Sequence, residues 1–212
     1  PAGVEHMLLR MNNGSHPEPP VVVDFSSHID KWAKDQDKFL AYADKNKYLT
    51  IFAWGPFGHT KLVQKTQSVV VEFPWLDIVK NEAYPVFAGA SVNQKYPGFR
   101  NKTAPDQKGQ INGLFRWRNV EDTARSFQME LRLVTKKELK KPVETPVGAV
   151  TDVTLRRVQN FKIGISEKIE WRMMRGKALL QSGEAQSDKQ GLLTLPGIKI
   201  SDNPAILTIT KK

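Results

Sequence analysis

The spacing of apolar residues changes near the middle of the chain, and no other feature constrains the fold as strongly. In residues 127–133, apolar side chains alternate with polar ones, which is the pattern of a β-strand with one buried and one wet face. Seven short runs of this kind, separated by turn-forming residues, fill the second half: 114–120, 127–133, 150–158, 169–173, 178–185, 192–195 and 205–210. Seven short strands within about 100 residues predict an all-β domain of two packed sheets.

The first half of the chain instead alternates strands with helices. Residues 21–23 are a β-branched run, and the capping pair Ser27 and Asp30 predicts that a helix begins just after it. Apolar residues at helical spacing continue to Lys45, and residues 49–54 form a second strand that is apolar on both faces. This order is one βαβ crossover, which needs further parallel strands beside it. We expect those strands in a portion of the protein that precedes this chain.

Composition marks the border between the two halves. Residues 96–113 are rich in Gly, Pro, Asn, Lys and Gln, which predicts a linker or a long surface loop. Before it, a helix is predicted to begin at Pro74 and to run toward Ala83. We therefore predict an α/β domain over residues 1–104 and an immunoglobulin-like or fibronectin-like β-sandwich over residues 105–212.

The first candidate for chemistry is the segment after the second predicted strand. Residues 54–60, with the sequence WGPFGHT, place His59 in a glycine-flanked loop directly after a buried strand. Asp30, or alternatively Asp24, follows the preceding strand. Over residues 19–60, this order of acid, helix, strand and histidine resembles the C-terminal part of the α/β-hydrolase fold of serine esterases and peptidases. The resemblance implies that His59 is the catalytic base and that Asp30 or Asp24 orients it.

The nucleophile that such an enzyme needs is missing from the chain. The elbow sequence Gly-x-Ser-x-Gly appears nowhere in it. The resemblance therefore implies a C-terminal fragment of an extracellular or periplasmic serine ester hydrolase, whose partner is the N-terminal part of the same protein, carrying the serine. Its substrate would be a small ester or a polymeric one, such as a carbohydrate ester or a polyester, and it would need no cofactor. The isolated chain is expected to be inactive.

The alternative hypothesis is a non-enzymatic sandwich that binds an acidic polysaccharide or a partner domain. The formal net charge is +10, and most of the surplus of Lys and Arg lies in residues 105–212. Such a surplus attracts acidic polymers, and Trp117, between Arg116 and Arg118, is the predicted contact for an acidic glycan. The charge alone does not favour nucleic acid, because no nucleic-acid-binding module accompanies it.

Metal and membrane partners are not predicted either. The chain has no cysteine and only four histidines, so neither a disulfide nor a thiolate or histidine-rich metal site is expected. No run of apolar residues approaches the roughly 18 that a membrane-spanning helix requires.

Overall fold

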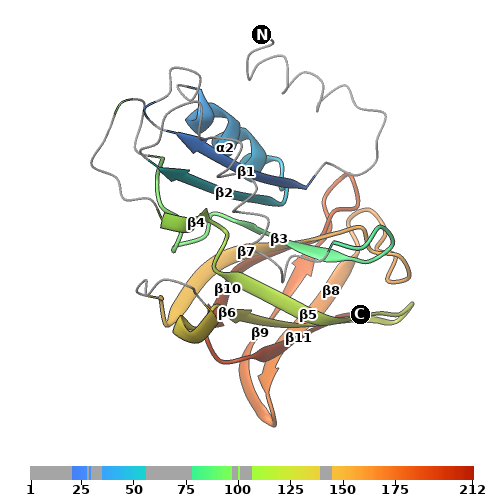
Figure 1. Ribbon diagram of the computed structural model, residues 1–212. Coiled ribbons are helices and arrows are strands. Elements are labelled where there is room, and N and C mark those ends of the chain that lie inside the picture. The colour runs from blue at the N-terminus through green and yellow to red at the C-terminus, as the bar shows by residue number, and fades with distance from the viewer. Residues whose placement is uncertain are drawn as a thin grey trace. The chain divides into compact units, whose positions relative to one another are not determined.

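The computed structural model in Figure 1 describes residues 21–27, 29, 35–55, 78–96, 100, 107–138 and 145–212. Its contacts divide the chain into two compact units, one made of residues 1–76 with 93–113 and the other of residues 77–92 with 114–212. The chain therefore leaves the first unit to contribute one segment to the second, returns to the first, and then completes the second.

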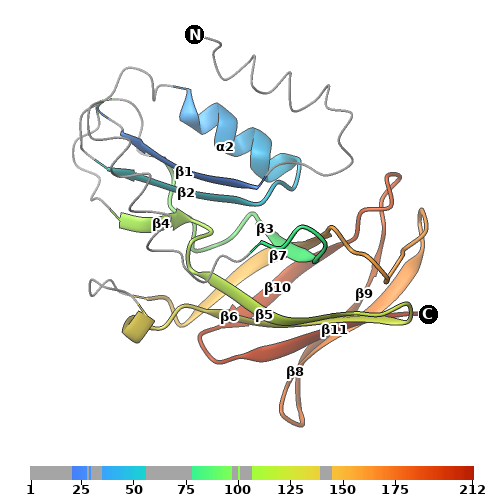
Figure 2. The ribbon, with the colours of Figure 1, turned by 45° about the vertical axis from the view of Figure 1, so that its right-hand side comes forward.

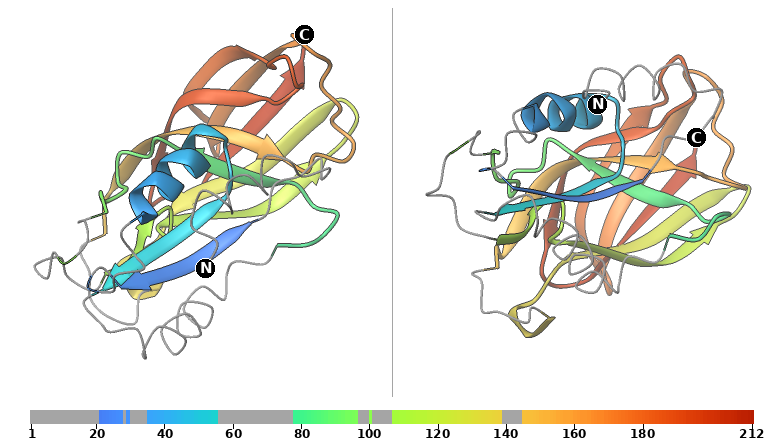
Figure 3. Two further views of the ribbon diagram at one scale, coloured as in Figure 1. Left: turned by 90° about the horizontal axis from the view of Figure 1, so that it is seen from above. Right: turned by 45° about the horizontal axis from the view of Figure 1, so that its top comes forward.

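The first unit contains a three-stranded sheet with the order β1-β2-β4. β1 (Val22–Ser27) and β2 (Thr50–Gly55) run parallel and are joined by α2 (Gln36–Lys45), so the predicted βαβ crossover is confirmed. α2 covers one face of this sheet (Figure 3) and buries Phe39 and Ala43. Every residue of β2 is buried, as expected for the central strand of a sheet covered by a helix.

The predicted α/β-hydrolase sheet is wrong. β4 (Gln107–Ile111) comes from the stretch whose composition predicts a linker, and it pairs antiparallel with β2, with Phe52 opposite Ile111. An α/β-hydrolase sheet is mostly parallel and carries helices on both faces. The described residues instead hold one parallel pair, one α-helix and three sheets in which strands dominate. The crossover therefore belongs to a small mixed sheet.

The second unit is a β-sandwich, as the period-two pattern predicts. One sheet has five strands in the order β5-β6-β11-β8-β9, and the other has three in the order β10-β7-β3. All pairs are antiparallel. Five strands facing three in this order differ from the four-facing-three arrangement of an immunoglobulin constant domain. The strands are β3 (Tyr84–Ala88), β5 (Phe115–Asp122), β6 (Ser126–Leu133), β7 (Gly148–Arg156), β8 (Lys168–Arg175), β9 (Ala178–Gln186), β10 (Thr194–Ser201) and β11 (Ala205–Lys211).

Side chains from the inner faces of both sheets form one core in this unit. In β6, the inward residues Phe127, Met129, Leu131 and Leu133 are buried. β8 and β11 contribute every second residue in the same way, and β7 and β10 close the core from the opposite sheet. The seven predicted strands are therefore all present, because alternation reports directly which side chains enter a two-layer core.

β3 stands close to the place where the sequence predicts the end of a helix. Among the described residues of that predicted helix, 78–83 form turns and irregular backbone, so the prediction is wrong there. All five residues of β3 are buried, and the strand pairs with β7. Pro85 fits in it because β3 is an edge strand, which needs hydrogen-bond partners on one side only.

β9 is the edge of the five-stranded sheet, and none of its residues is fully buried. Three strands cannot cover the whole inner face of five, so part of this edge strand stays open. Gly183 of β9 makes room for Trp171 of β8, because a Cβ at Gly183 would lie 2.9 Å from the indole ring. The indole thereby packs against the backbone of β9, a recurrent way to stabilise a glycine in an edge strand.

Candidate functional site

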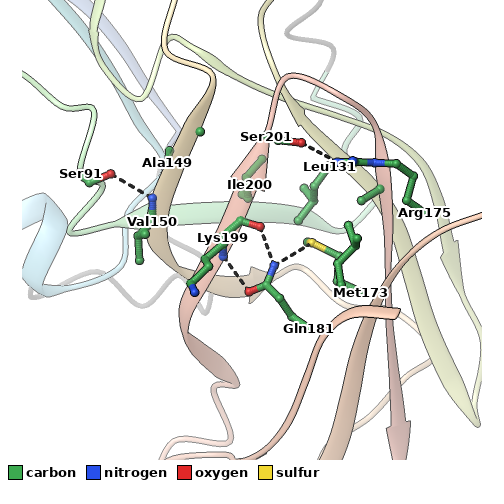
Figure 4. Close-up of a pocket in the computed structure, with 13 residues that line it drawn as sticks. Ser91, Leu131, Ala149, Val150, Met173, Arg175, Gln181, Lys199, Ile200 and Ser201 are labelled. Carbon is green, nitrogen blue, oxygen red and sulfur yellow. Dashed lines mark hydrogen bonds between the residues drawn. The ribbon is translucent and has the colours of Figure 1, made fainter. Parts of the chain in front are cut away.

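A cavity of about 400 Å³ lies between the two sheets at one end of the sandwich (Figure 4). The antiparallel register places Gly148, the first residue of β7, opposite Ser201, the last residue of β10. The ends of β6, β8, β9 and β11 reach the same cavity, and Ser91 reaches it from the loop after β3. Residues from distant parts of the sequence therefore meet there.

The floor of the cavity is the apolar core itself. Leu131, Met173 and Ile200 line it and are each no more than 2% exposed. Two further apolar side chains lie at its mouth, where Val150 is 44% and Leu180 is 41% exposed. The cavity is thus an opening into the core whose apolar surface continues to the outside.

Arg175 lies at the rim and is held there by neutral groups. Its Nη2 donates to Ser201 Oγ at 2.7 Å and to the carbonyl oxygen of Asn203 at 3.3 Å (Figure 4 shows the first contact). Ser201 Oγ in turn donates to the same carbonyl oxygen at 3.1 Å. Among the residues that the structure describes, no carboxylate forms an ion pair with this guanidinium. Its charge is therefore open to compensation by a ligand.

Gln181 of β9 joins the two sheets beside the cavity. Its Nε2 donates to the carbonyl oxygen of Lys199 in β10 at 2.6 Å, and its Oε1 accepts the backbone N–H of Lys199 at 2.9 Å (Figure 4). The same Nε2 contacts Met173 Sδ at 3.3 Å. One side-chain amide therefore satisfies the edge of β10 as a neighbouring strand would, and it fixes the width of the opening.

The charge of the lining is positive. Arg175 and Lys199 are its cationic side chains, and none of the lining residues is acidic. Ser91 and Ser201 add hydroxyl groups, and Ser91 Oγ accepts the backbone N–H of Val150 at 2.9 Å. An apolar floor, a few polar groups and a cationic rim are the properties of a pocket for an organic anion.

The residues predicted from the hydrolase resemblance are not placed by the structure. Asp30 and His59 lie outside the described residues. Asp24 belongs to β1, but its side chain is also outside what the structure describes. The catalytic triad therefore stays a prediction from sequence, without the sheet on which it was based.

The predicted glycan contact is divided between the two faces of β5. Trp117 points to the core side, where its ring centroid lies 6.1 Å from that of Phe87. Arg116 and Arg118 point to the outer face, because side chains alternate along a strand. Arg118 pairs with Glu130 at 2.6 Å. The structure therefore brings the two arginines to one face and does not bring Trp117 to them.

Arg116 belongs instead to a charge cluster on the outer face of the sheet. It lies opposite Arg132 in the register of β5 and β6, and its Nε is 3.9 Å from Glu138 Oε1. Glu138 accepts two hydrogen bonds from Arg132, each 2.7 Å long. The hydrogen bond from Arg132 is the main cause that lowers the pKa of Glu138 to about 2. Burial lowers the pKa of Arg116 to about 10, so it stays charged at neutral pH.

Sequence reasoning missed the cavity, although one signal of it was present. Leu179 and Leu180 are adjacent apolar residues in a strand of otherwise alternating pattern, so one of them has to leave the core face. The structure resolves this with an irregularity between Met173 and Met174, which shifts the register of β8 and β9. Such a shift depends on the pairing of strands and is not visible in one strand alone.

Comparisons with known proteins give no relative of this chain: no family model, no curated protein and no solved structure matches it. Within the described residues, no helix is long and apolar enough to cross a membrane, and no group of three or more His, Cys, Asp or Glu side chains is arranged to hold a metal ion. The cavity at the end of the sandwich is a candidate site within the described residues.

Proposed function

We propose that the chain is a non-enzymatic binding module, and that the cavity at the end of its sandwich takes a small organic anion with an apolar body. The observation that carries this proposal is the combination of an apolar floor with Arg175 and Lys199 and without any acidic side chain in the lining. The cavity volume of about 400 Å³ falls in the range of small-molecule sites.

The groups around the cavity supply recognition. Arg175 presents a guanidinium whose remaining N–H groups can donate a charged hydrogen bond to a carboxylate, and its protein partners are uncharged. The ligand's apolar part would displace water from Val150 and Leu180, the apolar side chains exposed at the mouth, which favours binding in proportion to the area buried. No His, Asp, Glu or Cys is among the lining residues to activate a hydroxyl group.

This proposal keeps the sequence-based alternative of a sandwich that binds, and it changes the ligand. An acidic polysaccharide carries polar groups along its whole length, and the floor of the cavity offers it apolar contacts only. A monocarboxylate with a hydrocarbon chain satisfies both parts of the cavity, because its charge meets Arg175 and its chain meets the core.

Thermal unfolding with three ligands tests the proposal: decanoate, decanol and acetate, each below its aggregation limit. Decanoate is expected to raise Tm in a concentration-dependent way, because it binds the folded state only. Decanol lacks the charge and acetate lacks the chain, so each should raise Tm less. Titration calorimetry gives the corresponding affinities.

Two arginine variants on the same strand sharpen this test. Arg175→Gln should weaken decanoate binding about tenfold and leave decanol binding unchanged, because a charged hydrogen bond is lost. Arg172→Gln is the matched control, since Arg172 is exposed on the outer face of β8. Equal Tm shifts with all three ligands, or equal losses in both variants, would show that the cavity does not recognise an apolar anion.

A further inference from the structure

The end of the β8–β9 hairpin exposes large apolar side chains. Leu179 is 59% exposed and Leu180 is 41% exposed. In Figures 1 and 2 the turn between the two strands reaches beyond the ends of β10 and β11 of the same sandwich. Exposed leucines at a projecting tip are not explained by core packing, and contiguous apolar surface of this kind marks an interaction site.

The strand register distributes these apolar side chains over both faces of the tip. Leu179 lies opposite Met174, and Met174 lies opposite Ile206 of β11. These three residues therefore form a row on the outer face of the sheet, because their neighbours Met173 and Leu207 point into the core. Leu180 instead lines the cavity. The tip is thus apolar on both sides.

Cations surround this apolar tip. The nine residues 173–181 contain Arg175 and Lys177 and no acidic residue. Gly176 has a φ of +55°, which lets the chain reverse tightly and places Lys177 in the exposed turn. Lys199, whose backbone is bound by Gln181, adds a third exposed cation beside the cavity.

We propose that this tip docks on an anionic lipid surface, with Leu179 and Leu180 in the boundary between headgroups and acyl chains and with Arg175 and Lys177 at the level of the phosphates. Apolar side chains flanked by cations bind such interfaces through burial and electrostatic attraction together. A second copy of the chain is a poorer occupant of this tip, because a symmetric contact would bring the like charges of two tips together. Docking requires no membrane-spanning segment, and it goes beyond the proposed pocket function without depending on it.

Sedimentation with lipid vesicles tests this inference. The protein is expected to co-sediment with vesicles of phosphatidylcholine and phosphatidylglycerol, to bind phosphatidylcholine alone far more weakly, and to be released as salt rises. Leu179→Ser should reduce the partition coefficient roughly tenfold, since it removes one buried leucine. Leu179 does not line the cavity, so this variant should keep the decanoate affinity of the unmodified chain.

Ile165→Ser is the matched control, because Ile165 is 69% exposed and lies outside the hairpin. It should sediment as the unmodified protein does, and circular dichroism verifies that both variants are folded. Three results would overturn the inference: no preference for the anionic vesicles, equal binding by Leu179→Ser and Ile165→Ser, or self-association in the ultracentrifuge that Leu179→Ser abolishes. Loss of decanoate binding alone would reject the proposed function and leave lipid docking standing.

Discussion

Glu138 is the residue that compensates two neighbouring positive charges on the outer face of the five-stranded sheet. Arg116 and Arg132 lie directly opposite each other on β5 and β6, an arrangement of like charges that is unfavourable by itself. Glu138 also accepts the backbone N–H of Thr135 at 2.8 Å and its hydroxyl at 2.9 Å. The carboxylate therefore neutralises one arginine pair and fixes the turn that follows β6.

The stability that Glu138 contributes should depend on pH. Its folded-state pKa is lowered to about 2 from an ordinary 4.5, so the contribution is complete above about pH 4.5 and is lost as the pH falls toward 2. Glu138→Gln should lower Tm by a few degrees at pH 7. This gap, the difference in Tm between the variant and the unmodified chain, should shrink below pH 4. Glu82→Gln, at an exposed position, should show no such gap. A gap of the same size at pH 3 and pH 7, measured by thermal unfolding, would contradict this role.

At the scale of single residues, neighbours in the sequence do not predict neighbours in space. Arg116, Trp117 and Arg118 are adjacent in the chain, but adjacency on a strand separates side chains onto opposite faces. The alternation of side chains along a strand therefore argues against one binding surface formed by all three residues. The structure places Trp117 beside Phe87 on the core side. The carboxylate partners of both arginines were not predictable, because Glu130 meets Arg118 through the register of β5 and β6 and Glu138 reaches Arg116 from the turn after β6.

At the scale of elements, β5 is tied to the segment before β8 by one carboxylate. The two oxygens of Asp122 accept the backbone N–H groups of Gln159 at 2.5 Å, Asn160 at 3.1 Å and Phe161 at 2.6 Å. Phe161 is fully buried in the core next to this anchor. Asp122 thereby positions a connection that has no regular secondary structure of its own.

Removing this anchor should destabilise the sandwich. Asp122→Ala leaves three N–H groups without their acceptor, and we expect the free energy of unfolding to fall by about 2 kcal/mol. Glu121→Ala is the control, because Glu121 is the exposed neighbour of Asp122 in β5. Urea denaturation of both variants gives the comparison. If the urea midpoints of Asp122→Ala and Glu121→Ala fell by the same small amount, the Asp122 anchor would not contribute to stability.

Seven of the eight strands of the sandwich were predictable, and their order was not. Period-two alternation depends on one strand and one core, so it locates seven strands from local sequence alone. Pairing depends on contacts between residues far apart in the chain, as in Ile206 of β11 opposite Glu130 of β6 and Met174 of β8. β4 and β3 were not predicted for a related reason: four of the five residues of β4 are Gln, Lys or Gly, and β3 contains Pro85, so pairing with β2 and β7 decides their conformation.

At the scale of the whole molecule, the βαβ crossover of the first unit does not determine the sheet around it. Strand, helix and strand with a glycine-flanked histidine after them describe a local βαβ unit, which occurs in many folds. The resemblance to α/β-hydrolases extended that unit into a large parallel sheet. The antiparallel β4 beside β2 shows a small mixed sheet. Local order thus identified the crossover correctly and could not identify the sheet around it.

The path of the chain between the units leads to a prediction about truncation. A boundary near residue 104 would separate β3 from the rest of the sandwich, although residues 77–92 belong to that unit. β3 supplies Phe87, which stacks on Phe115 with ring centroids 4.1 Å apart and lies opposite Val153 of β7. Without β3, these core residues and the edge of β7 would be exposed.

A chain of residues 105–212 should therefore fold poorly, whereas residues 77–92 joined to 114–212 by a short Gly/Ser linker should unfold cooperatively. The joined chain retains all eight strands of both sheets, and its linker replaces a segment that belongs to the other unit. Circular dichroism and thermal unfolding of the two chains make the comparison. Cooperative unfolding of the 105–212 chain at the same Tm would show that β3 is dispensable, and that seven strands already close the core.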